Sequence, residues 1–244
     1  MSADAEYILS ALQRVDCERR LRIADSELWQ RVHAVKSWQH ARFERTYADL
    51  LDDRRYAQAA RFFLEELYGP GDFTRRDAQF ARVVPGLVRL FPQEIVTTVR
   101  LLAELHATSE ELDTIMGRAV SRLPLDRHEY VRAWQHTGRR EDRERQIDLV
   151  IAIGKALDRH TRRPMLRRTL HLMRVPARAI GLDELQRFLE SGFDTFGAMG
   201  GAEEFLGIVS QRERQLAQAL FSLPADRAAI GATDNSGVLT SLPD

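Results

Sequence analysis

Cysteine is almost missing from this sequence of 244 residues, in which Cys17 is the single example. One cysteine cannot form an intrachain disulfide, and it cannot supply the thiolates of a structural zinc site. The chain is therefore not a small scaffold held by disulfides. Its hydrophobic content of 44% and charged content of 30% are instead typical of a globular protein with a sizeable core.

Long apolar runs are missing as well. The longest, LVIAIG at 149–154, is far shorter than the ~20 residues that a membrane-spanning helix needs. The first residues, MSADAEYILSALQRVD, lack both the basic segment and the apolar segment of a signal peptide. We therefore expect a cytoplasmic protein with no membrane partner.

The motifs of common enzymes are absent too. There is no Gly-x-Gly-x-x-Gly nucleotide fingerprint, no Gly-x-Ser-x-Gly elbow and no His-Glu-x-x-His zinc motif. His40 and Glu44 have the i, i+4 spacing of two metal ligands on one helix, but His33 lies too far along that helix to complete the site. An enzyme is not favoured, and we predict no catalytic residue, no metal site and no cofactor.

What the sequence does contain is apolar residues at helical spacing. Between Leu28 and Leu50 they recur three, four or eight residues apart, which defines one face of a long helix. Further segments share this periodicity and are separated by prolines: Pro92, Pro124, Pro164 and Pro176. The pattern predicts an all-α fold, a single helical bundle domain of roughly ten helices over residues 1–222, with no sheet. Residues 223–244 are small, polar and rich in turn formers, so we expect them to form a flexible tail.

One heptapeptide stands out, the run FFLEELY at 62–68. Together with the stretch DELQRFLESGFDTFGAMGGAEEFL at 183–206, it resembles a bacterial group labelled FFLEELY-motif proteins. The resemblance covers about residues 1–222. Since this group has no established activity, cofactor or catalytic residue, the resemblance implies a helical fold and supplies no mechanism.

The heptapeptide can also be interpreted from its residues alone. On a helix, Phe63 shares a face with Ala60, and Leu64 lies beside it, so a helix end that docks on the core is the favoured interpretation. The two acids, Glu65 and Glu66, then lie toward the other side. The alternative is that Glu65 or Glu66 is buried with a raised pKa, which would make it a candidate functional acid.

The most specific feature is the separation of charge near the C-terminal end. Residues 159–178 contain seven arginines and no acid, whereas 181–206 contain six acids and one arginine. If a helix begins at Pro164, one stripe along it is cationic. We predict that this region forms an interaction face, with these residues: Arg163, Arg167, Arg168, His171, Arg174 and Arg178.

Three interpretations of the two charged blocks remain open. Internal pairing of the blocks is favoured. The second interpretation is a face for another protein or for a second copy of the chain, in which the charges set the register. The third is nucleic-acid binding, which the net charge of zero and the adjacent acidic block argue against.

Two functional hypotheses therefore lead. The first is a non-enzymatic protein-interaction module, which binds another protein or forms a homodimer and predicts an exposed apolar patch beside the arginines. The alternative is a protein that binds a small apolar or anionic ligand, or a haem-like cofactor, and it predicts an enclosed cavity in the bundle. An enzyme would instead need acid, base and histidine side chains that converge in a cleft, of which the sequence shows no sign.

Overall fold

The computed structural model describes residues 2–67, 71–222 and 242–243. Within these ranges the chain is helical and contains no strand, so the predicted all-α fold is confirmed. Twelve α-helices and one π-helical turn are present in the described ranges, slightly more than the ten expected, because short helices follow several of the chain breaks.

The first half of the chain forms long helices joined by short connections. Side-chain caps mark two of the starts: Ser2 Oγ accepts a hydrogen bond from the Ala5 amide, and Asp25 accepts from the amides of Glu27 and Leu28. Pro85 lies inside the helix Thr74–Leu90. The elements are α1 (Ala3–Ala24), α2 (Ser26–Thr46), α3 (Ala48–Asp52), α4 (Ala57–Phe62), the π-helix η1 (Phe63–Leu67), α5 (Thr74–Leu90) and α6 (Gln93–Ala119).

The second half continues in the same way, with Gly138 in the left-handed conformation (φ 60°) directly after α7. Proline begins α9 at Pro164, where its missing amide is not needed. The elements are α7 (Arg127–Thr137), α8 (Arg140–Thr161), α9 (Pro164–Leu172), α10 (Arg174–Ala179), α11 (Asp183–Ala198) and α12 (Glu203–Ser222).

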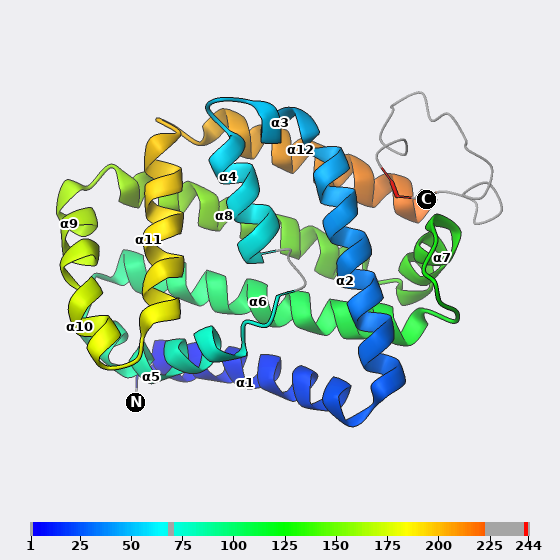
Figure 1. The fold of residues 1–244 in the computed structure, drawn as a ribbon, viewed down its shortest axis with the longest axis horizontal. Helices are drawn as coiled ribbons and strands as arrows, with labels where there is room; N and C mark the ends of the chain where they lie inside the picture. Colours follow the sequence, from blue (N-terminus) through cyan, green and yellow to red (C-terminus); the bar gives the residue numbers. More distant parts are fainter. Residues whose placement is uncertain (1, 68–70, 223–241, 244) are drawn as a thin grey trace.

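The centre of the bundle is α6, which packs against α1, α2 and α8. Figure 1 shows α6 and α8 running across the molecule, with α1 along one side and α2, α4 and α11 crossing in front. The bundle therefore has two layers of helices that cross one another.

Close packing of two of these helices depends on a small residue. A Cβ added at Gly154 of α8 would lie 2.5 Å from Leu206 Cδ2 of α12.

The FFLEELY heptapeptide supplies part of the core. Phe63 and Leu64 are buried in a cluster with aromatic residues of α2, α11 and α12, so their predicted burial is confirmed. Glu65 is exposed and Glu66 is half-buried, so the favoured interpretation holds for Glu65 and the alternative, a buried acid, is wrong for it. The helix changes from α to π at Phe63.

The end of the chain differs from the expected loose tail. Leu242 is completely buried in the cluster that contains Trp38, Tyr130 and Trp134. Its carbonyl accepts hydrogen bonds from Arg45 Nη1 at 3.0 Å and from Arg127 Nη2 at 2.9 Å. The expectation of a flexible tail is therefore wrong at Leu242, while 223–241 and 244 lie outside the described residues.

Leu242→Ala should lower the free energy of unfolding by about 2 kcal/mol, the low end of the usual cost for a buried leucine because a chain end can relax around the cavity. Urea unfolding followed by circular dichroism measures the change. Leu90→Ala is the matched control, since Leu90 is exposed. Equal stability of the two variants would show that burial of the Leu242 side chain contributes nothing to stability.

Candidate functional site

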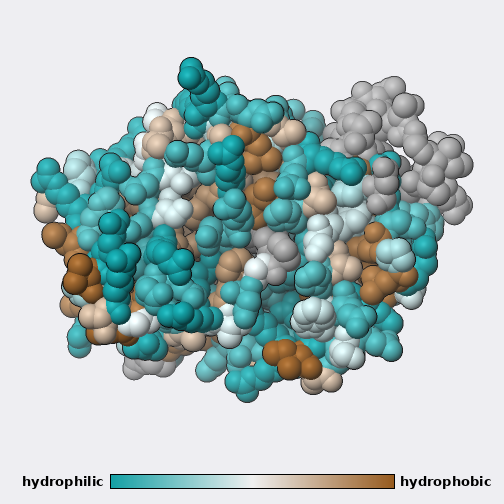
Figure 2. Space-filling model, viewed as in Figure 1, coloured by the Kyte–Doolittle hydropathy of each residue, from teal (hydrophilic) through white to brown (hydrophobic). Residues whose placement is uncertain are grey.

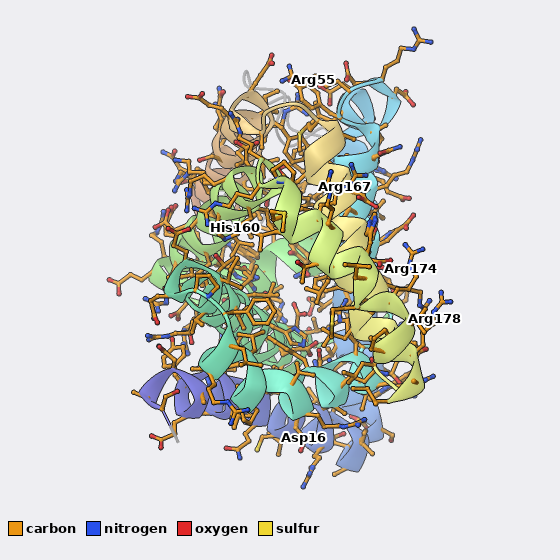
Figure 3. All side chains as sticks on the ribbon, turned by 90° about the vertical axis from the view of Figure 1, so that its left-hand side faces the viewer. Asp16, Arg55, His160, Arg167, Arg174 and Arg178 are labelled. Carbon is orange, nitrogen blue, oxygen red and sulfur yellow. The ribbon has the colours of Figure 1, made fainter. Side chains whose placement is uncertain are left out.

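The residues of the predicted interaction face lie at one end of the bundle. Arg167, Arg174 and Arg178 follow one another along α9 and α10, as Figure 3 shows. The neighbouring helix α11 carries most of the acidic block and packs against both α9 and α10. The two charged blocks of the sequence are therefore side by side in space.

Several arginines of this region pair with α11. Arg167 Nη2 lies 2.9 Å from Asp194 Oδ1, and His171 Nε2 lies 3.7 Å from Asp194 Oδ2. Arg174 Nη2 lies 2.8 Å from Glu190 Oε2. Burial opposes ionisation of Glu190, but the hydrogen bonds from Arg174 outweigh it and the pKa of Glu190 is lowered. The favoured interpretation, internal pairing of the blocks, is confirmed for these residues.

The other predicted arginines behave differently. Arg163 pairs at 2.7 Å with Glu94, at the start of α6. Arg168 and Arg178 are exposed and form no ion pair with any residue that the structure describes. Internal pairing therefore uses only part of the positive charge of this region.

Exposed apolar side chains surround the two arginines that lack an ion pair. α9 has no buried residue at all, and Leu172 is 78% exposed. Figure 2 shows apolar side chains gathered at this end of the molecule. We call this surface the α9–α10 face, made of these residues: Met165, Arg168, Leu172, Met173, Val175, Arg178 and Ile180.

A second site lies inside the bundle, where the alternative functional hypothesis expected a cavity, although Glu66 alone among its lining residues was a predicted site residue. It is a cavity of about 160 Å³ bordered mainly by α2, α5, α6, α7, α8, α11 and α12. One face of α6 follows it from Val99 to Asp113, apolar at first and polar from His106 onward. Charged residues of both signs line this otherwise apolar space.

A buried ion cluster occupies the polar part of the cavity. Glu110 accepts hydrogen bonds from Arg22 Nη2 and from Lys36 Nζ, the latter at 2.9 Å. Burial alone would raise the pKa of Glu110, but Lys36 and Arg22 outweigh it and hold this pKa at about 2. Asp113 lies 3.6 Å from Lys36, and burial together with the charge of Glu110 raises the pKa of Asp113.

A histidine–carboxylate pair adjoins this cluster. His106 Nε2 lies 2.7 Å from Asp77 Oδ2, and Arg19 Nη2 lies 2.7 Å from the same oxygen. Burial opposes ionisation of Asp77, but the contacts with His106 and Arg19 outweigh it and its pKa is lowered. Next to Asp77, Arg76 donates to Glu66 at 3.0 Å, which brings one acid of the FFLEELY heptapeptide to the cavity wall.

Aromatic residues line the cavity beside α7. The rings of Trp38 and Tyr130 stack with centroids 3.6 Å apart, and Trp134 packs against Tyr130 at 6.1 Å. The guanidinium of Arg143 lies 4.2 Å from the centre of the Trp134 ring. Arg143 Nη1 also donates to Gln146 Oε1 at 3.3 Å.

Acid, base and histidine side chains therefore line one partly open cavity, and the sequence did not indicate this convergence. The available signal was the spacing of His106, Glu110 and Asp113, since residues three and four apart share a helix face. These three positions continue the apolar stripe that begins at Val99. A polar stripe that continues an apolar stripe marks the side of a helix that faces the interior and meets polar partners there.

The comparisons with known proteins place the chain in a family. A family model described as a domain of unknown function (DUF8198) matches residues 18–227. The chain belongs to this family. The match runs from within α1 to beyond α12, so it contains the α9–α10 face and every residue that lines the cavity except Leu12. No curated protein and no solved structure matches the chain.

Two further properties concern only the described part of this DUF8198 domain. None of its helices combines the length and the apolar character that crossing a membrane requires. Nor do three or more histidine, cysteine or acidic residues there gather as metal ligands. His40 Nδ1 and Glu44 Oε2, the pair with metal-ligand spacing, lie 3.9 Å apart.

Proposed function

We propose that this DUF8198 protein is an interaction module whose α9–α10 face binds another protein. The observation that carries the proposal is the set of apolar side chains on this face, with Met165 69% and Val175 74% exposed. A contiguous exposed apolar surface costs free energy in water, and in monomeric proteins it commonly marks a binding site. The core does not use these residues, because α9 buries none of its own.

The charges of the face favour a partner with an acidic rim. Arg168 and Arg178 stand among the apolar residues without an internal ion pair in the described ranges. A twofold contact of this face with itself would place two faces that both carry these unpaired positive charges opposite one another, which is less favourable than an acidic partner. We therefore favour a different protein over a homodimer, and an apolar segment flanked by Asp or Glu as its binding element.

A photo-crosslinking residue placed at Leu172 should capture one partner protein in the native cell, whereas the same residue at Ile23, an equally exposed position in α1, should not. The partner is then purified and its affinity measured. Leu172→Ser with Val175→Ser should weaken binding at least tenfold, and added salt should weaken it further because the arginines contribute. Ile23→Ser should leave the affinity unchanged.

Three results would contradict this function. Crosslinks that join only copies of the chain would make the face a dimer interface. Binding to anionic lipid vesicles that depends on Leu172 and Val175, with no protein captured, would make it a membrane-surface site. Full affinity of the purified partner for the double serine variant would place the binding surface elsewhere.

We also infer a cytoplasmic, bacterial protein that groups with the FFLEELY-motif proteins. The complete heptapeptide at 62–68 lies inside the matched region and supports the grouping. The exposed free thiol of Cys17 is in keeping with a reducing compartment.

A further inference from the structure

The cavity along α6 is larger than the voids of an ordinary protein core. Protein interiors are packed at the density of organic crystals, and voids larger than a water molecule are few. A cavity of ~150 Å³ in an engineered protein is sufficient to bind benzene. The cavity here measures about 160 Å³ and is partly open, so a compound built on one aromatic ring fits it and can enter from solvent.

The charges on the cavity wall nearly cancel. Five carboxylates and four lysine or arginine side chains line it: Glu66, Asp77, Glu110, Asp113 and Glu213, against Lys36, Arg42, Arg76 and Arg143. Two of these carboxylates also pair with a cation that does not line the cavity, Asp77 with Arg19 and Glu110 with Arg22. An ion that enters would lose its hydration and meet no surplus of the opposite charge, so the wall favours an uncharged ligand.

Two buried indole N–H groups belong to the aromatic part of the wall. Trp38 and Trp134 line the cavity and are 6% and 7% exposed. The Nε1 atom of each is buried and forms no hydrogen bond within the described part of the chain. The large majority of buried side-chain polar atoms in proteins do have a partner, because a buried donor without one costs free energy. The two donors therefore indicate that an acceptor from outside the chain meets them.

The two indoles lie in one aromatic group. Both pack on Tyr130, with ring centroids 3.6 Å apart for Trp38 and 6.1 Å apart for Trp134. Leu216 and Ala217 of α12 line the cavity and belong to the same core cluster. A ring with a carbonyl oxygen would match both the apolar wall and the indole donors, because a carbonyl oxygen accepts hydrogen bonds and carries no charge.

We propose that this cavity binds a small uncharged aromatic compound whose carbonyl oxygen accepts a hydrogen bond from the indole N–H of Trp38 or Trp134. The ring of this compound packs on the apolar side chains around the two indoles, and its oxygen supplies the acceptor for a buried donor. The proposal is independent of the α9–α10 face, because none of the residues of that face lines the cavity.

Four probes of nearly equal shape test the charge class and the role of the oxygen on the wild-type protein at pH 7. They are the uncharged ketone acetophenone, the hydrocarbon α-methylstyrene, which has a methylene group in place of the oxygen, the anion benzoate and the cation benzamidinium. Titration calorimetry should show that acetophenone binds at least tenfold more tightly than either ion, because neither ion meets a surplus of the opposite charge.

The indole signals of the protein report the hydrogen bond directly. The chain has three tryptophans, and Trp29 is 51% exposed and does not line the cavity, so a nitrogen–proton correlation spectrum contains one reference signal and two cavity signals. Trp29→Phe identifies the reference signal by removing it. Acetophenone should move the indole proton of Trp38 or Trp134 downfield of its position with α-methylstyrene, because only the ketone accepts a hydrogen bond. The Trp29 signal should stay in place.

A cavity-filling substitution tests the location. Ala217→Leu extends a lining side chain into the space and should weaken acetophenone binding at least tenfold. Ala78→Leu, at an exposed position of α5, is the matched control and should bind as the wild type does. Thermal unfolding of both variants without probe separates loss of the cavity from loss of the fold.

The proposal fails under any of several results. These are a dissociation constant of acetophenone above about 1 mM, equal or tighter binding of either ion, and unchanged acetophenone binding by folded Ala217→Leu. Cavity indole signals that respond to the ketone as they do to the hydrocarbon would also overturn it, because water alone would then meet the two donors. If Ala217→Leu does not fold, the four probes on the wild type still decide. None of these outcomes bears on the crosslinking at Leu172, so the two proposals stand or fall separately.

Discussion

Glu110→Gln should lower the free energy of unfolding by about 3–5 kcal/mol, the usual effect of removing one partner from a buried ion pair. Glu110 is 4% exposed and forms ion pairs with Arg22 of α1 and Lys36 of α2. The glutamine keeps the size of the side chain but removes the carboxylate that pairs with Arg22, and it leaves Lys36 with Asp113 alone. Urea unfolding measures the loss.

The matched control is Glu27→Gln, which removes an exposed ion pair with Arg31 within one helix. Such surface pairs contribute about 0–1 kcal/mol, so this variant should unfold almost as the wild type does. If Glu110→Gln lowers the free energy of unfolding no more than Glu27→Gln does, the buried ion cluster does not hold α1, α2 and α6 together.

The same carboxylate predicts how stability depends on pH. The pKa of Glu110 is about 2 in the folded protein against 4.5 for the ordinary group. A lowered pKa gives stability that is fully present above pH 4.5 and is lost as the pH falls toward 2. At about 1.4 kcal/mol per unit, the loss is on the order of 3 kcal/mol. The Glu110→Gln variant should lack this part of the acid sensitivity.

The helices were predictable because each depends on residues close together in the chain. Apolar spacing between Leu28 and Leu50 located α2, and prolines located the breaks before α6 and α9. The pairing of the arginine block with α11 was also predictable, since Arg174 and Glu190 are 16 residues apart and separated by one tight turn.

The cavity was not predictable in the same way. Glu110 meets Arg22 across 88 residues and Lys36 across 74, and nothing local indicates which charged residues will face one another. A charged residue is almost never fully buried unless it is paired. A charged residue on a helix is therefore predicted to be exposed as long as its partner is unknown. The π-helical turn at Phe63–Leu67, which carries Glu66 of the cavity wall, had no sequence signal either.

Phe63→Ala should lower the free energy of unfolding by about 3–5 kcal/mol, the usual cost of deleting a fully buried phenylalanine side chain. Phe63 is 3% exposed and stands where α4 becomes the π-helix. Its ring lies 5.6 Å from that of Phe205, edge to face, and 6.2 Å from that of Phe196. These contacts join the FFLEELY heptapeptide to α11 and α12 at once, so no single neighbour can move in to fill the space.

Phe91→Ala is the matched control, because Phe91 is 42% exposed at the end of α5 and belongs to none of the core clusters. Chemical unfolding should separate the two variants by more than 2 kcal/mol, since removal of an exposed ring leaves no cavity. A Phe63→Ala variant as stable as Phe91→Ala would mean that the heptapeptide does not hold the core. The role of the heptapeptide would then have to be sought in the pair that Glu66 forms with Arg76 at the wall of the cavity.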